Sequence, residues 1–255
     1  MRPFHASDQA SGLRRMFGRR PARWSLVVQP AGRTVGQATA IARRAQEISE
    51  RMGTHGPTPT LIIDGARSQV AHAFGLKARY DLDHALEGDC HLGDAVLAVP
   101  ASSLWVLPAA RAIDRSCGEE GQAARVTQAI ESVGARVQHI VLTLPPTRLA
   151  FLRRIGDLAA WRQALIPMDS SPDAGTGALA AIRQTMSDTE IADFRLLFSG
   201  MGKAAAGRLL SGTAAIARRH FGATVSAAEP VEDLWLAEMP AQPAGERPPL
   251  VETVI

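Results

Sequence analysis

The sequence predicts an α/β fold with a doubly wound, mostly parallel sheet, and two patterns lead to this prediction. Short apolar runs rich in β-branched residues alternate with longer stretches that have helical length and periodicity. The runs are apolar throughout, which is typical of parallel strands covered by helices on both faces. With 255 residues, 46% of them hydrophobic, the chain is long enough to bury a sizeable core.

The expected elements follow one another along the chain as strands separated by helices. Strands are predicted at residues 25–29, 60–64, 104–107, 139–144, 164–168, 195–198 and 224–227. Helices are predicted at residues 36–51, 120–133, 175–186 and 203–220. The turn-rich residues 53–59 join the first helix to the second strand.

Three regions differ in composition. Residues 1–23 hold a short helix with Ala10, Leu13 and Phe17 on one face, followed by an arginine-rich linker broken by glycine and proline. Residues 24–237 form the α/β domain. Residues 238–255 contain four prolines and no helical apolar stripe, so they are expected to form a disordered tail. We therefore expect a flexible N-terminal helix ahead of one folded domain.

Composition also limits the function classes. The sequence has no run of 18 uncharged apolar residues that would indicate a membrane-spanning helix, and the N-terminus lacks the apolar core of a secretory signal. Cys90 and Cys117 fit neither a disulfide framework nor a metal-ligand spacing, so a reducing cytoplasm is expected. The formal net charge of +3 is a weak signal for nucleic-acid binding. Lys77 and Lys203 are the only lysines, which leaves few candidates for a phosphate-binding lysine.

The first predicted strand leads through a glycine-containing loop into a helix, which is the setting of a phosphate cradle. This loop resembles the one in MinD/ParA-like (deviant Walker A) ATPases, whose pattern is Gly-Lys-Gly-Gly-x-Gly-Lys-Thr-Thr. In this alignment Ala31 stands at the first glycine of the pattern and Gly32 at the lysine that follows it. Arg33 and Thr34 stand at the two central glycines, and Val35 and Gly36 match the next two positions. Gln37 replaces the phosphate-binding lysine, and Ala38 replaces the hydroxyl that holds magnesium.

These replacements remove the cation that balances phosphate charge and a protein ligand of the metal. Two interpretations remain: a plain strand-to-helix turn without ligand, or a loop in which Arg33 contacts phosphate with a different geometry. We expect no cofactor, with ATP and magnesium bound weakly if at all, and no metal site.

The two switch segments of the family are changed as well. The second strand ends in Asp64-Gly65-Ala66, where the family has Asp-x-Asp; Asp64 matches the aspartate near the metal, and Ala66 removes the one that orients water. Asp64 is alternatively a loop or capping aspartate. The fourth run continues into Thr143-Leu144-Pro145-Pro146, where the family has Asp-Thr-Gly-Ala-Gly. The combined losses predict that ATP hydrolysis is absent.

Two further segments resemble the flagellar-number branch of this family, FlhG (also FleN). Residues 75–88 match Gly-Leu-x-Pro-Arg-Tyr-Thr-Leu-x-Asp-x-Leu-x-Gly in part, with Tyr80 the only tyrosine; packing and helix capping are the alternative role. Near the N-terminus, Asp8, Gln9, Ala10, Leu13 and Arg14 match the Asp-Gln-Ala-x-x-Leu-Arg motif. By contrast, Ser199-Gly200-Met201-Gly202-Lys203 is interpreted as a turn, because no glycine stands five residues before Gly202.

In that branch the N-terminal helix docks on the signal-recognition-type GTPase FlhF and stimulates its GTP hydrolysis. The resemblance implies a regulator of flagellar number or placement that is recruited to the cell pole by this partner. Gln9 would orient the attacking water and Arg14 would pair with acidic or phosphate groups. Flagellar switch or regulatory proteins, a homodimer and an intact paralogue are the other partners it implies.

The alternative function is a divergent MinD/ParA-like ATPase that uses Arg33 and Asp64 and acts in spatial positioning. No membrane partner is expected, because the tail lacks the family's amphipathic helix.

Overall fold

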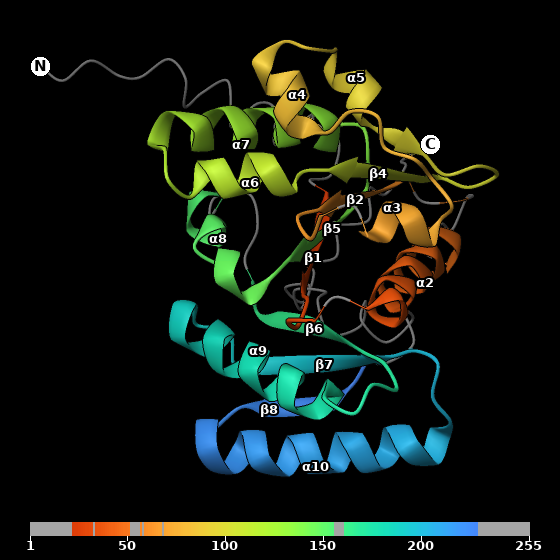
Figure 1. Ribbon diagram of the computed structural model, residues 1–255, viewed down its shortest axis with the longest axis vertical. Helices are drawn as coiled ribbons and strands as arrows, with labels where there is room; N and C mark the ends of the chain where they lie inside the picture. Colours follow the sequence, from red (N-terminus) through yellow and green to blue (C-terminus); the bar gives the residue numbers. More distant parts are fainter. Residues whose placement is uncertain are drawn as a thin grey trace, which may run out of the picture.

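A mostly parallel sheet covered by helices on both faces makes up the computed structural model, which describes residues 22–32, 34–51, 57, 59–67, 69–155 and 161–228 (Figure 1). Within these residues the strands are β1 (Arg23–Val28), β2 (Thr60–Asp64), β3 (Leu97–Ala98), β4 (Leu104–Pro108), β5 (His139–Leu144), β6 (Gln163–Met168), β7 (Asp193–Phe198) and β8 (Thr224–Ala227). They form one sheet in the order β3-β4-β2-β5-β1-β6-β7-β8, and every pairing is parallel except β3 with β4. The predicted fold class is therefore confirmed.

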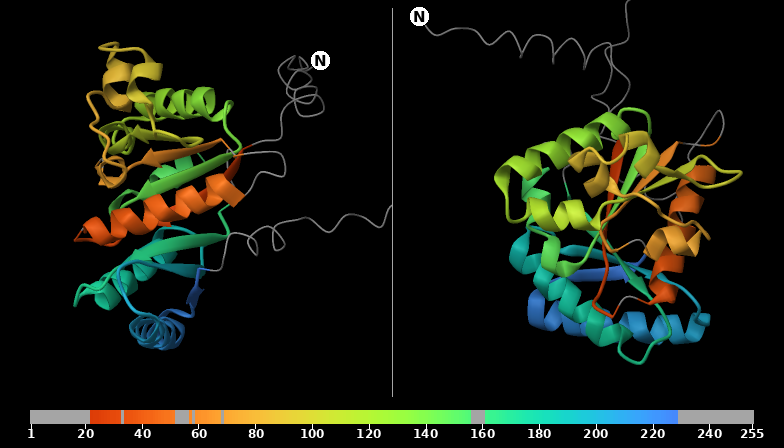
Figure 2. Two further views of the ribbon diagram at one scale, coloured as in Figure 1. Left: turned by 90° about the vertical axis from the view of Figure 1, so that its right-hand side faces the viewer. Right: turned by 45° about the horizontal axis from the view of Figure 1, so that its top comes forward.

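The described helices connect these strands. They are α2 (Val35–Arg51), α3 (Gln69–Ala73), α4 (Leu82–Glu87), α5 (Leu92–Ala95), α6 (Ala110–Ser116), α7 (Glu120–Gly134), α8 (Phe151–Arg154), α9 (Ala174–Asp188) and α10 (Lys203–Phe221), with a 3-10 turn η1 (Pro146–Arg148). Figure 1 shows α2 and α3 on one side of the sheet and α6 to α8 on the other. Figure 2 shows β7, β8, α9 and α10 gathered at one end of the molecule.

The central strands form because their residues are apolar on both faces. Every residue of β2 and of β5 is buried, as expected for strands sandwiched between two helical layers. One apolar cluster lies between the sheet and α6 to α9, and it includes Leu26, Leu61 and Ile140. A second cluster lies under α2 and α3 and includes Val27 and Ile62. Alternate residues of each strand thus face opposite layers.

Helix α2 shows why the amphipathic pattern predicts its position. Ala38, Ile41, Ala45 and Ile48 recur at spacings of three and four residues, and all four are buried. Its predicted start at residue 36 is one residue from the observed start at Val35. The structure also contains short elements that periodicity did not predict, namely α3, α4, α5, α6, α8 and β3.

The segment between β2 and β4 depends on capping by charged side chains. Asp81 caps α4 by accepting a hydrogen bond from the His84 backbone N–H at 3.2 Å. Arg111 of α6 donates two hydrogen bonds to the same carboxylate, from Nε at 2.8 Å and Nη2 at 2.9 Å. Although burial acts to raise the pKa of Asp81, the hydrogen bonds from Arg111 and His84 outweigh it and lower the pKa. Helix capping and packing, the alternative role named above for residues 75–88, thus account for part of this segment.

A buried histidine lies at the start of β5. His139 is 6% exposed, and its Nε2 lies 2.9 Å from Ser25 Oγ; its Nδ1 has no hydrogen-bond partner among the described residues. Burial lowers the pKa of His139 to about 3, and the charges of Arg23 and Arg44 act in the same direction. His139 is therefore neutral in the folded protein at neutral pH.

This histidine predicts an acid-sensitive fold. Between pH 6.5 and about 3 the unfolded chain binds a proton at residue 139 that the folded chain does not, so the free energy of unfolding falls as the pH falls. The contribution is at most about 1.4 kcal/mol per pH unit. Urea unfolding at several pH values should show a shallower acid loss for His139→Gln than for wild type. The exposed His220→Gln control should keep the wild-type slope; equal slopes in all three proteins would contradict this prediction.

Candidate functional site

The carboxyl ends of four neighbouring strands bring polar side chains to one edge of the sheet. Because β2, β5, β1 and β6 are adjacent and parallel, the chain leaves them at the same edge. Asp64 ends β2, Gln29 follows β1 and Asp169 follows β6. The strand order also reverses around β1, and ligands of open α/β sheets bind at such a point. The loop from β1 to α2 is therefore the candidate site.

This loop joins the end of β1 to the start of helix α2, which is where the sequence predicts a phosphate loop. The chain turns at Ala31 and Gly32, and α2 starts at Val35. Thr34 Oγ1 accepts a hydrogen bond from the Gln37 backbone N–H at 3.1 Å, which is the usual role of a residue that caps a helix N-terminus. Arg33, which the alternative function requires, lies outside the described residues.

Asp169 places a carboxylate at the N-terminus of α2. Thr34 Oγ1 donates a hydrogen bond to Asp169 Oδ2, and the Ser171 backbone N–H donates to Oδ1 at 2.9 Å. A Cβ on Gly36 would lie 2.7 Å from Asp169 Cβ, so only glycine allows this close approach. Although burial acts to raise the pKa of Asp169, the hydrogen bonds from Ser171 and Thr34 outweigh it and lower the pKa. The side chain is therefore an anion beside the positive end of the helix dipole.

Gln37, with a neutral amide side chain, stands at the position where the family has its phosphate-binding lysine. Gln37 is 4% exposed, and its Oε1 accepts a hydrogen bond from Gln29 Nε2 at 3.4 Å. The same Nε2 donates to Gln69 Oε1 at 3.2 Å. The neighbouring Ala38 is buried, while Val35 projects into solvent. Neither Gln37 nor Ala38 supplies a positive charge or a hydroxyl to a bound phosphate.

The Asp64 carboxylate accepts hydrogen bonds from the protein's own backbone. Its Oδ1 accepts from the Ala66 N–H at 2.9 Å and from Thr143 Oγ1 at 3.3 Å, and its Oδ2 accepts from the Val70 N–H at 3.1 Å. Burial raises the pKa of Asp64, even though these hydrogen bonds act in the opposite direction. The residue thus caps a loop and the first turn of α3, which is the alternative role that the sequence left open.

A backbone hydrogen bond joins the two altered switch segments. Gly65 N–H donates to the Thr143 carbonyl at 3.0 Å, and a Cβ on Gly65 would lie 2.4 Å from that same oxygen. After β5, the chain runs through Pro145 into the 3-10 turn that starts at Pro146. Proline fixes one backbone torsion and removes a donor, so this segment has less freedom than the glycine-rich switch of the family.

The five predicted partner-binding residues belong to the part of the chain that the structure does not describe. Asp8, Gln9, Ala10, Leu13 and Arg14 lie outside the described residues, so their role and the boundaries of the terminal regions stay predictions. The segment around Lys203 is the turn between β7 and α10, with Gly202 as the helix N-cap, as expected.

The described residues also bear on metals and membranes. Among them, no group of three or more His, Cys, Asp or Glu side chains is arranged to hold a metal ion. In the same part of the chain, no helix combines the length and the apolar character needed to cross a membrane.

The Thr34–Asp169 contact predicts a local loss of stability on substitution. Thr34→Val removes both the cap of α2 and the donor to a buried carboxylate, so the free energy of unfolding should fall by about 1–3 kcal/mol. Thr39→Val is a matched control, because the Thr39 hydroxyl only donates to the Val35 carbonyl of its own helix. Urea denaturation compares the two variants, and equal losses would contradict a special role for Thr34.

Comparisons with known proteins support the fold. No protein-family model and no curated protein sequence matches the chain. Among solved structures it is similar to the MinD cell division protein of Aquifex aeolicus, with 19% identity, a TM-score of 0.53 and coverage of 82% of this chain and 84% of that one. It is also similar to the McdA–ATP complex of Cyanothece, with 15% identity, a TM-score of 0.52 and coverage of 77% and 81%.

A putative plasmid partition protein of Borrelia burgdorferi B31 bound to AMPPNP is similar over 85% of this chain and 90% of that one, with 15% identity and a TM-score of 0.51. At these identities the likeness concerns the fold alone. The chain therefore has a MinD/ParA-like α/β fold.

Proposed function

We propose that this chain acts in spatial positioning by binding partner proteins, with a phosphate loop that is filled by its own carboxylate. The fold supports the first part, because MinD, McdA and the plasmid partition protein have similar structures. The single observation that carries the second part is the Asp169 carboxylate, which Thr34 and Ser171 hold against the start of α2.

The electrostatics of the loop oppose a nucleotide. A triphosphate at the N-terminus of α2 would meet the anionic Asp169, and like charges at close range repel each other. Gln37 is neutral and buried, so it offers no positive charge to offset this repulsion. To bind, the nucleotide would also have to break the hydrogen bond by which Thr34 engages the carboxylate.

A divergent ATPase is the second candidate. The similar McdA and partition proteins are described in complex with ATP and AMPPNP, which favours a nucleotide in this fold. This candidate requires Asp169 to move away and Arg33 to supply the missing charge. It also requires Asp64 to release at least one of the backbone groups that it now accepts from.

Calorimetric titration with ATP and Mg²⁺ distinguishes these candidates. The wild-type chain should bind with a dissociation constant weaker than about 1 mM, for the reasons of charge given above. Asp169→Ala combined with Gln37→Lys removes the anion and restores a cation, so this variant should bind ATP at least about tenfold more tightly than wild type.

The matched control is Asp173→Ala with Gln37→Lys, which has the same net charge but alters an exposed aspartate and leaves Asp169 in place. It should gain much less affinity. Micromolar binding by the wild-type chain would overturn the proposal in favour of the ATPase.

We further propose that the flagellar branch of the family gives the positioning role its partner. The support is the sequence motif of Asp8, Gln9 and Arg14, together with residues 75–88. The N-terminal helix would bind an FlhF-like GTPase and stimulate its GTP hydrolysis, with Gln9 orienting the attacking water. Because the helix acts on the partner's nucleotide, this activity needs no ATP on the chain itself.

The GTPase rate of an FlhF-like protein tests this part. The full chain should raise the rate equally with and without ATP, and Gln9→Ala should abolish the increase because the water is no longer oriented. Ser11→Ala, one position outside the motif's fixed letters, should stimulate like wild type. No stimulation by the wild-type chain would remove the flagellar assignment, whereas stimulation only with ATP would indicate a functional phosphate loop.

A further inference from the structure

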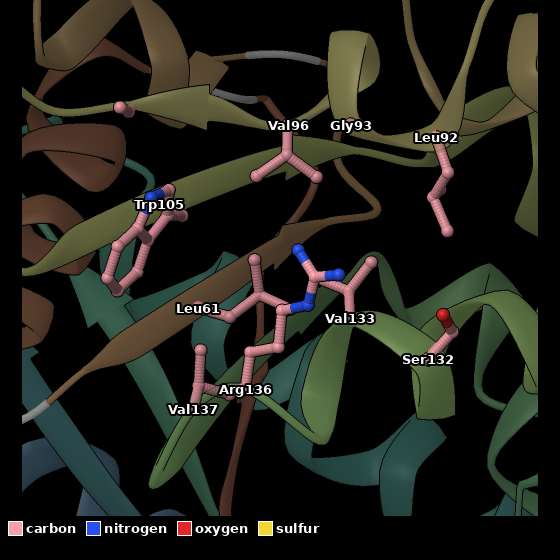
Figure 3. A pocket seen from close by; sticks show the side chains of 10 residues that line it. Leu61, Leu92, Gly93, Val96, Trp105, Ser132, Val133, Arg136 and Val137 are labelled. Atoms are coloured by element: carbon pink, nitrogen blue, oxygen red, sulfur yellow. The ribbon is translucent and has the colours of Figure 1, made fainter.

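An apolar pocket of about 420 Å³ lies at the edge of the sheet opposite the phosphate loop. It is lined by residues from the starts of β2 and β4, from α5 and from the end of α7. Its larger apolar side chains are Leu61, Leu92, Val96, Trp105, Val133 and Val137 (Figure 3). Arg136 is the only charged side chain among the residues that line it. A pocket of this size and character is suited to a few large apolar side chains.

The described chain begins beside this pocket. Arg23 N–H donates to the Gln138 carbonyl at 2.9 Å, and residue 138 directly follows Val137 of the pocket wall. Ala22 and Trp24 pack on the same apolar cluster as Leu61. The residues that precede Ala22 therefore join the domain at the same edge of the sheet as the pocket.

We propose that the pocket is the docking site of the chain's own residues 8–17. The sequence predicts a helix there with Ala10, Leu13 and Phe17 on one face. Leu13 and Phe17 are large apolar side chains one turn apart, and they match a pocket with an aromatic and several aliphatic walls. Docking would remove both groups of apolar side chains from water.

The residues between the predicted helix and Ala22 are long enough for the helix to reach the pocket. Residues 18–21 connect the helix to Ala22 and span at most about 14 Å when extended. Strands of a sheet lie about 4.8 Å apart, so β2, two strands away from β1 through β5, is about 10 Å distant. A second copy is not needed to supply the segment.

The charges near the pocket are mixed: Arg136 lines it, and the exposed carboxylates Asp94 and Glu131 are sequence neighbours of the lining residues Gly93 and Ser132. The apolar match, rather than charge, favours the N-terminal segment as the occupant.

Docking would hold Gln9 and Arg14 against the domain, so a partner that uses the helix would have to displace it from the pocket. This inference concerns contacts within the chain alone. It therefore stands or falls independently of the proposed stimulation of a GTPase.

Hydrogen exchange on the full-length chain tests the proposal. Leu13→Asp places a charge on the apolar face, outside the folded domain, and should release the helix. Backbone amides of residues 92–98 and 130–137 should then exchange at least about fivefold faster than in wild type, while those of α10 should not change. Ser11→Asp makes the same change of charge on the opposite helix face and should leave exchange as in wild type. A peptide of residues 1–21 added to the Leu13→Asp chain should restore slow exchange.

Each other result would overturn the proposal. Unchanged exchange in Leu13→Asp would mean that the pocket is not covered by this segment. Equal acceleration in Ser11→Asp would indicate an effect of charge rather than docking. Protection that is lost on dilution of the wild-type chain would assign the pocket to the N-terminal segment of a second copy.

Discussion

The hydrogen bond between Thr34 and Asp169 fixes the relation between the first helix and the sixth strand. It joins a residue that caps α2 to a residue that leaves β6, across 135 positions of sequence. Gly36 is required because the helix approaches Asp169 so closely. The position of α2 over the sheet, and hence the shape of the loop before it, depends on this contact.

Several of the surrounding polar groups are hydrogen-bonded within the protein. Gln37 pairs with Gln29, and Asp64 accepts from two backbone N–H groups and from Thr143. A site built to receive an anion usually presents unpaired donors and a cation to solvent. This site instead pairs the Gln37 backbone N–H with Thr34 and adds the negative charge of Asp169. The fold is shared with nucleotide-binding proteins, but chemistry depends on the residues of the site.

The main strands and helices could be predicted from the sequence because burial imposes a simple pattern on them. The predicted ranges 60–64, 139–144 and 224–227 agree with β2, β5 and β8. Short helices such as α4 were missed, since α4 is held by the Asp81 cap and by Arg111 of another helix rather than by its own periodicity. The motif positions of Gln37 and Ala38, which lie in the first turn of α2, could be found by resemblance to a family motif. The role of Asp169 could not, because only the folded sheet brings the end of β6 to the loop after β1.

The central place of β1 also has a consequence for biosynthesis. Its two neighbours in the sheet are β5 and β6, and it pairs with no strand that is close in sequence. When a ribosome makes the chain, β1 emerges first and must wait until residue 144 before its first partner is complete. At about 5–20 residues per second this delay is roughly 6–23 s. During that time an apolar strand has no permanent cover, so the newly made chain depends on temporary burial by α2 or on a chaperone until its second half has been synthesised.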